Sequence, residues 1–242
     1  MAGTRYDIAF TTTKLVKFCN NPGTNHFKAF FWPLGYIKKT MNFGIRYYHD
    51  MKSSPLGELL RRNNMEYEGE ALTFSDSTWQ DCIDTGQSTG SYVTFCQGGL
   101  IDYSSFVPDP IVMSSREAEY NTCAVATMAS LTNWYIDVDF KYLGTKLTDD
   151  LDYIKPGGKN WKPTRILLDS QAAVSMAETA KSTSRTRHID WCFHCIWEGQ
   201  ATGKHQIGWI SRSDQLADVR MKAVTFAALS PAQATLFVNV ID

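Results

Sequence analysis

The sequence predicts an α/β fold, in which a mixed five-stranded sheet is flanked by helices and preceded by a helical extension. Three short segments with alternating apolar side chains, at residues 72–76, 91–96 and 100–105, are typical of antiparallel strands. Two later apolar segments, at residues 164–169 and 206–210, are separated by helical patterns. Strands that alternate with helices are usually parallel strands joined by crossovers. The prediction is therefore a sheet of three antiparallel strands followed by parallel crossovers.

The first 50 residues are expected to be mainly helical. Residues 7–18 and 24–39 have helical patterns, separated by a turn at Asn20–Gly23. Pro33 is expected to kink or break the second helix, because proline removes a backbone hydrogen bond. Residues 43–48 favour a short strand. Residues 50–70 are polar, which indicates a linker that carries a short helix. We therefore expect two regions, a helical segment at 1–69 and the α/β domain at 70–242.

A long helix is predicted over residues 113–134, because small and apolar residues are almost continuous from Ala118 to Leu131. Ser114 and Glu117 have the spacing of a capping box, which places the helix start. Glu119 lies beyond this cap on a face of small or apolar residues. A carboxylate there needs a partner, a metal ion or access to solvent, because burying it unpaired is costly.

The remaining helical patterns cover residues 170–179, 187–199 and 214–223. Together with the strands, these helices determine where three acids lie in the fold. Asp76 ends the first strand of the sheet, Asp169 ends the fourth, and Asp218 lies in the closing helix. Strand ends and the helices above them converge at one edge of such a sheet, so these acids and Glu119 can meet.

Four clustered carboxylates would repel one another unless divalent cations neutralised them. Oxygen ligands without His or Cys favour Mg²⁺ or Mn²⁺. Two such ions, about 4 Å apart, could stabilise both the attacking and the leaving oxygen in phosphodiester cleavage. The competing interpretation is that these are solvated acids at the ends of separate elements.

The amino-acid composition excludes few classes of protein. Of the 242 residues, 43% are hydrophobic and 20% charged, and the formal net charge is −1, so any nucleic-acid binding must come from local patches. No apolar run reaches the roughly 20 residues of a membrane span, and the N-terminus lacks a signal-peptide pattern. We expect a cytoplasmic or nuclear protein without a membrane partner.

Several short motifs follow one another along the chain. They are Thr73–Trp79, Gln87–Val93, Ser114–Tyr120, Leu168–Ala173, Arg187–Asp190 and Asp214–Asp218, preceded by Thr4–Ala9, Asn21–Pro22, His26–Ala29 and Gly35–Lys38. In this order the chain resembles the ribonuclease H region of copia-type LTR retrotransposon polyproteins, over most of residues 4–222. The N-terminal residues are similar to the thumb and connection segment that joins the polymerase to ribonuclease H in those polyproteins, and the elements of diatoms and other marine algae are especially similar.

This resemblance implies a metal-dependent endonuclease that cuts the RNA strand of RNA–DNA hybrids with two Mg²⁺ or Mn²⁺ ions. The family's four acids fall on Asp76, Glu119, Asp169 and Asp218. Asp76 would contact both ions, Glu119 and Asp169 would complete the shell of one, and Asp218 would hold the other. Contacts to the hybrid backbone are expected from six further residues: Ser88, Thr89, Ser115, Ser170, Gln171 and His188. For all of these except His188, a role as a turn or cap residue is an equal alternative.

The resemblance also implies partners and a location. The RNA–DNA hybrid is the expected substrate, and the polymerase part of the same reverse transcriptase is a second expected partner. The protein would then act in a cytoplasmic retrotransposon particle or in the nucleus. The alternative is a catalytically inactive ribonuclease H-like module that binds the hybrid or serves as a connection domain. A related nuclease that acts on DNA is a third interpretation.

Overall fold

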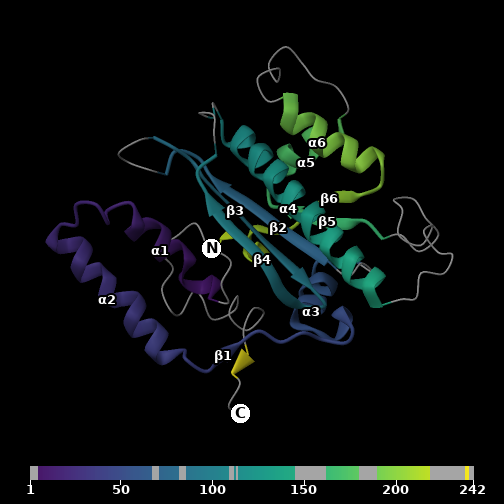
Figure 1. Ribbon diagram of the computed structural model, residues 1–242. Helices are drawn as coiled ribbons and strands as arrows, with labels where there is room; N and C mark the ends of the chain where they lie inside the picture. Colours follow the sequence, from purple (N-terminus) through teal and green to yellow (C-terminus); the bar gives the residue numbers. More distant parts are fainter. Residues whose placement is uncertain are drawn as a thin grey trace.

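A five-stranded mixed sheet forms the centre of the molecule (Figure 1). The computed structural model describes residues 5–66, 71–81, 86–108, 112, 114–144, 162–179, 190–218 and 238–239. The strands follow the spatial order β4-β3-β2-β5-β6, with β2, β3 and β4 antiparallel and β5 and β6 parallel to β2. Their bounds are β2 Ala71–Thr78, β3 Thr89–Cys96, β4 Gly99–Phe106, β5 Thr164–Leu168 and β6 His205–Trp209. The predicted sheet, with three antiparallel strands followed by parallel crossovers, is confirmed.

A two-residue turn joins β3 to β4. Both of its residues have positive φ angles, 50° at Gln97 and 72° at Gly98, as hairpin turns that match the twist of a sheet require. A β-carbon at Gly98 would lie 2.5 Å from Cβ of Ser54. The turn therefore needs glycine for two reasons, its backbone conformation and its close contact with the segment before α3.

Three helices cover one face of the sheet: α4 (Ser115–Gly144), α5 (Gln171–Glu178) and α6 (Asp190–Ala201) (Figure 1). Small residues of α4 allow it to lie close to the strands, and Tyr120 is fully buried there. The Ser114 hydroxyl accepts the backbone N–H of Glu117 at 3.2 Å, which confirms the predicted N-cap of this helix. The apolar cluster under these helices is Tyr92, Tyr120, Cys123, Ala124, Ala126, Ile166, Leu168, Ala173, Val174, Ala177, Ile196 and Ile207.

The opposite face is covered by α3 (Pro55–Arg62) together with short 3₁₀ turns at Tyr6–Ile8, Met51–Ser53 and Arg212–Asp214. The short helix predicted within residues 50–70 is present as α3, which is amphipathic and places its leucines in the core. Leu56, Leu59 and Leu60 are buried in one cluster with Phe74 and Phe95. Core contacts therefore cross the predicted division at residues 69 and 70, and that division remains a prediction.

The N-terminal residues are mainly helical, as predicted. They form α1 (Ala9–Val16), α2 (Thr24–Lys39) and the short strand β1 (Phe43–Gly44), which pairs antiparallel with β7 (Val238–Asn239). Pro33 does not break α2. No residue of this helix is buried, so the carbonyl group that loses its partner at Pro33 can bond to water. No helix among the described residues is both long and apolar enough to span a bilayer.

The predicted closing helix at 214–223 differs from the structure. Residues 212–214 form a 3₁₀ turn, and the chain then continues through turns to Asp218. Residues 219–223 lie outside the described residues. Residues 214–217 therefore form no regular α-helix before Asp218, because hydrogen bonds to the sheet and to Asn63 hold them in an irregular path.

Candidate metal centre

The candidate site lies where two parallel strands separate. The ladder between β2 and β5 ends at the pair Phe74 and Leu167, although β2 continues to Thr78. Asp76 lies in this last part of β2, and Asp169 directly follows β5. Glu119 approaches the same edge from the second turn of α4. Parallel strands and the helices above them leave a crevice at such a point, which brings acids from three separate elements together.

The carboxylate oxygens of Asp76, Glu119 and Asp169 all lie within 4.8 Å of one another. Three of the four acids named from the sequence are thus brought together. Each offers a hard oxygen ligand, and no His or Cys belongs to the group, so the donor set fits a hard divalent cation.

Glu119 carries the electrostatic cost of this arrangement. Burial raises the pKa of Glu119 to about 9, with further contributions from the negative charges of Asp76 and Asp169. The guanidinium of Arg212 and the backbone N–H of Ser77 act in the opposite direction. The buried oxygen Oε2 of Glu119 has no hydrogen-bond partner in the described part of the chain. A bound cation would supply the positive charge that this carboxylate lacks.

Asp218 is not a member of the three-carboxylate group, but the chain brings it to the same edge. The Ser91 hydroxyl donates to the carbonyl of Ala217 at 2.9 Å, and Ser91 is the direct strand partner of Asp76. Directly opposed residues of an antiparallel pair point to the same face of a sheet. Ala217 and the half-buried Asp218 therefore lie on the face towards which Asp76 points.

Two residues at the rim of the site were not among the predicted site residues. Arg212 Nε lies 3.9 Å from Asp169 Oδ2, and its side chain is 78% exposed. The indole N–H of Trp209 donates to the carbonyl of Asp169 at 3.0 Å, and this tryptophan is 44% exposed. Both lie at or just beyond the end of β6, next to the end of β5. The parallel order of these strands was the available signal.

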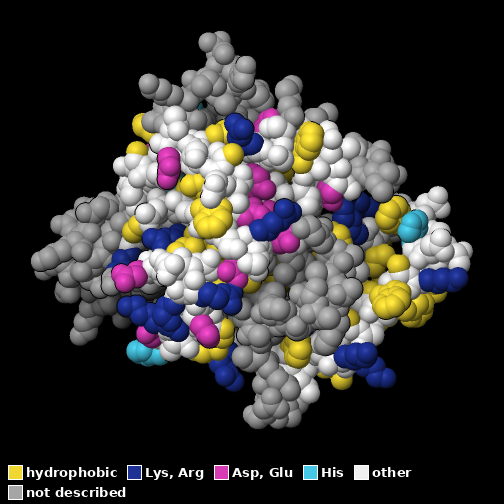
Figure 2. All heavy atoms as spheres, turned by 180° about the vertical axis from the view of Figure 1, so that it is seen from behind, with side chains coloured by type: hydrophobic (Ala, Val, Ile, Leu, Met, Phe, Trp, Pro, Cys, Tyr) yellow, Lys and Arg dark blue, Asp and Glu magenta, His cyan; other side chains and the backbone are white. Residues whose placement is uncertain are grey.

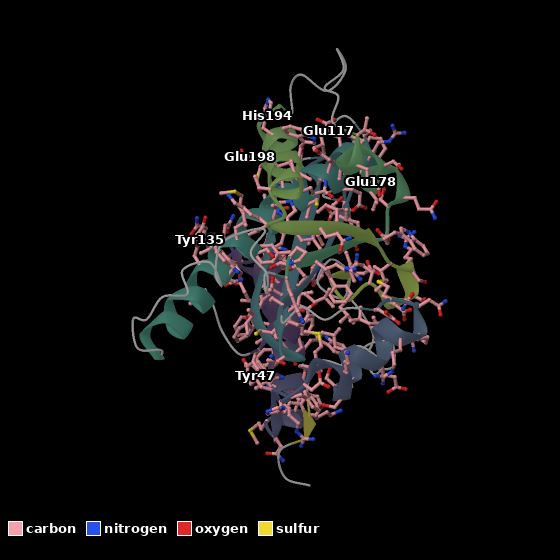
Figure 3. All side chains as sticks on the ribbon, turned by 90° about the vertical axis from the view of Figure 1, so that its right-hand side faces the viewer. Tyr47, Glu117, Tyr135, Glu178, His194 and Glu198 are labelled. Atoms are coloured by element: carbon pink, nitrogen blue, oxygen red, sulfur yellow. The ribbon has the colours of Figure 1, made fainter. Side chains whose placement is uncertain are left out.

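The molecular surface also shows acidic and basic side chains next to one another (Figure 2). Seen from behind, acidic side chains gather near the centre of the molecule, with a basic side chain against them (Figure 2). Glu117, in the first turn of α4, lies at the opposite end of the molecule from Tyr47 (Figure 3), whose hydroxyl bonds to Leu100 near the β3–β4 turn. The acids and the tight hairpin turn thus occupy opposite ends of the sheet.

The six residues predicted to contact a hybrid backbone fall into three groups. Ser88 accepts the backbone N–H of Gln80, Thr89 donates to Asp81, and Ser170 caps α5, so these hydroxyls already have partners within the chain. Ser115 and Gln171 are exposed at the starts of α4 and α5. His188 lies outside the described residues. Contact with a hybrid remains a prediction for all six.

Comparisons with known proteins bear on this site. The chain is 27% identical over 228 residues to the retrovirus-related Pol polyprotein from transposon RE1 of Arabidopsis thaliana, a match that covers 94% of this chain and 13% of that protein. It is 25% identical to the corresponding polyprotein from transposon TNT 1-94 of Nicotiana tabacum, over 93% of this chain and 14% of that protein. The chain is similar to a segment of retrovirus-related Pol polyproteins. No protein-family model matches it.

These relatives also set limits. The chain spans about 13–14% of their length, so the activities of the whole polyprotein remain proposals for this segment. Both come from flowering plants, and nothing supports the closer resemblance to diatom or algal elements.

Among solved structures, the chain is similar to LC11-RNase H1 in complex with an RNA/DNA hybrid, with 15% identity and a TM-score of 0.38, over 62% of this chain and 91% of that one. The sheet order and strand directions of the chain itself make its fold ribonuclease H-like, as the motifs implied.

Proposed function

We propose that this chain is a metal-dependent endonuclease that hydrolyses the RNA strand of RNA–DNA hybrids. The observation that carries the proposal is the group formed by Asp76, Glu119 and Asp169, in which a pKa of about 9 at Glu119 marks a strongly unfavourable burial of charge. Such perturbed acids are concentrated at functional sites. The similarity to Pol polyproteins of transposons supports a role on nucleic acid.

In this proposal the chain supplies a fixed set of ligands. Asp76, Glu119 and Asp169 would hold one side of a two-ion site, and Asp218 would complete the other. Two Mg²⁺ or Mn²⁺ ions bound there would stabilise the charge on the attacking and leaving oxygens of phosphodiester hydrolysis. Asp76 is oriented for this role by the backbone N–H of Ser77, which donates to its Oδ1 at 2.8 Å.

The remaining proposed contacts concern the substrate. Ser115 and Gln171 lie at helix N-termini, where backbone N–H groups favour phosphate oxygens. The exposed guanidinium of Arg212 can reach a phosphate at the rim of the acids. Recognition through phosphates and the 2′-hydroxyl would make cleavage largely independent of base sequence. Residues 1–69 are proposed to correspond to the segment that joins polymerase to ribonuclease H, with the polymerase as a partner.

The test is cleavage of a labelled RNA–DNA hybrid in Mg²⁺ or Mn²⁺ by the full chain and two variants. Asp76→Asn removes the charge of an acid in the group. Asp50→Asn is the matched control, because Asp50 is exposed, lies away from the acids and caps a 3₁₀ turn, a role that Asn also fills. We expect metal-dependent cleavage of the RNA strand that Asp76→Asn loses and Asp50→Asn retains.

Other outcomes decide between the alternatives. Folded wild-type protein that binds the hybrid but cleaves nothing in either metal would identify the inactive binding module. Equal cleavage of a DNA duplex would identify a nuclease indifferent to the 2′-hydroxyl. Cleavage that persists in EDTA would reject the metal mechanism.

A further inference from the structure

A buried glutamine occupies the point where β2 and β5 separate. Gln215 is 4% exposed, and its Nε2 donates to the carbonyl of Ser75 at 3.0 Å and to that of Leu167 at 3.5 Å. Ser75 directly precedes Asp76, and Leu167 is two residues before Asp169. One side-chain amide therefore bonds to the backbones of both strands that carry acids, just beyond the last pair of their ladder.

The same amide also determines the path towards Asp218. Its carbonyl oxygen Oε1 accepts the backbone N–H of Ala217 at 3.3 Å, and the backbone carbonyl of Gln215 accepts the N–H of Asp218 at 3.4 Å. Glutamine suits this place because its side chain offers two donor hydrogens and an acceptor at once. Neither glutamate nor methionine could bond to two carbonyls and an N–H in the same way.

Three residues of the N-terminal region also hold this segment. The hydroxyl of Tyr6 donates to the carbonyl of Leu216 at 2.6 Å in the buried core. Asp214 pairs with Arg62 and accepts the side-chain amide of Asn63 at 2.8 Å. Residues 214–217 are thus bound to β2, β3, β5, α3 and the first turn of the chain, which explains why they leave regular helix geometry.

We propose that Gln215 is a positioning residue that holds Asp218 in register with Asp76 and Asp169, so that the second divalent ion can bind. This inference rests on the proposed function. Its physical basis is that ligand carboxylates act as a set only when their backbones are fixed relative to one another, and partners that orient ligands typically change metal affinity or activity by about 10–100-fold when they are lost.

The test compares Gln215→Met with Gln200→Met in the full chain. Gln200 is a matched control, because its Nε2 donates to the carbonyl of Ala177 at 2.7 Å and its Oε1 accepts the N–H of Ile207 at 3.4 Å. It thus joins α6 to α5 and β6, away from the acids. Three quantities are measured: the stoichiometry and affinity of Mn²⁺ by calorimetric titration, kcat and KM on the hybrid, and the unfolding temperature.

We expect both variants to lower the unfolding temperature, because each loses hydrogen bonds that are buried or partly buried. Only Gln215→Met should weaken the lower-affinity Mn²⁺ ion by about tenfold or more and lower kcat by about tenfold or more, with KM little changed. Wild-type Mn²⁺ binding and kcat in Gln215→Met would overturn the proposal. Equal losses in Gln200→Met would also overturn it, since the effect would then follow stability alone.

If Gln215→Met does not fold, Gln215→Asn takes its place, because this change keeps the amide but shortens the side chain, so that it cannot bond to both strands at once. It should weaken the same Mn²⁺ ion, and unchanged Mn²⁺ binding would reject the proposal. Failure of the proposed function can be told apart from failure of this proposal. If wild-type protein cleaves no hybrid, the proposed function fails, and the Mn²⁺ titrations still decide the role of Gln215. If wild type and Gln215→Met cleave the hybrid at equal rates, the positioning role of Gln215 is rejected, but the proposed nuclease function is not.

Discussion

Replacing Glu119 by glutamine should stabilise the metal-free protein at neutral pH. In the folded protein the pKa of Glu119 is raised from its ordinary value of 4.5 to about 9, chiefly by burial and then by the charges of Asp76 and Asp169. Between these two pH values the unfolded chain has lost the proton that the folded chain still holds. Stability therefore falls as the pH rises through this window, because the folded state must keep Glu119 protonated or bury its charge.

The size of the effect follows from the shift in pKa. Each pH unit within the window costs about 1.4 kcal/mol, so the penalty reaches about 3 kcal/mol at pH 7. A glutamine at this position carries no charge and can donate to the neighbouring carboxylates. The Glu119→Gln variant should avoid most of this cost at pH 7 and gain little at pH 4.5.

The assay is urea unfolding in EDTA at pH 5 and pH 8, repeated with saturating Mn²⁺. Glu58→Gln is the matched control, since Glu58 is exposed in the first turn of α3. Wild type should gain stability from Mn²⁺ by mass action, and Glu119→Gln should gain less. A Glu119→Gln variant that is less stable than wild type at pH 8 in EDTA would refute the reasoning, as would a difference that does not change with pH.

Three further predictions concern the fold. Leu56→Ala should cost about 2–5 kcal/mol of unfolding free energy in urea titrations, because this α3 side chain is fully buried; a loss below 1 kcal/mol would show that α3 is peripheral. Gly199→Ala should cost about 1–3 kcal/mol or more by thermal unfolding, since its β-carbon would lie 1.8 Å from the His205 ring, and an unchanged unfolding temperature would contradict that contact. Burial lowers the pKa of His205 from 6.5 to about 4, so stability should fall as the pH drops through that window. In urea titrations at pH 7 and pH 5, the His205→Gln variant should lose less unfolding free energy between the two pH values than wild type. Equal losses in the two proteins would contradict the prediction.

The sheet could be predicted from the sequence because its signals are local. Alternation marks β2, β3 and β4, and Gln97–Gly99 marks the turn between two of them. The positions of the four acids followed from the order of strands and helices, and three of them, two at strand ends and one on a helix, do converge. Local periodicity and turn chemistry are physical constraints that act on neighbouring residues, so they are visible without the fold.

The errors concern contacts between residues far apart in the chain. The polar residues of 50–70 concealed the apolar stripe of α3, whose leucines are buried only because β2 and β3 lie opposite them. Asp218 was assigned to a regular helix, although side chains from Tyr6, Ser91 and Gln215 determine its path. Arg212 and Trp209 carried no motif, and only the adjacency of β5 and β6 brings them to Asp169. No local pattern encodes such contacts.

The bond between Tyr6 and Leu216 has a consequence for synthesis of the protein. Its two residues are separated by 210 positions, and Tyr6 is almost completely buried. During synthesis the ring of Tyr6 can complete this bond only after Leu216, 210 residues later, has been made and has reached the same part of the core. Contacts of such long range slow folding, because the loop must close before they contribute. The part of the core beside α3 that Tyr6, Leu216 and Ala217 fill is therefore incomplete on the nascent chain until the segment leading to Asp218 has been made.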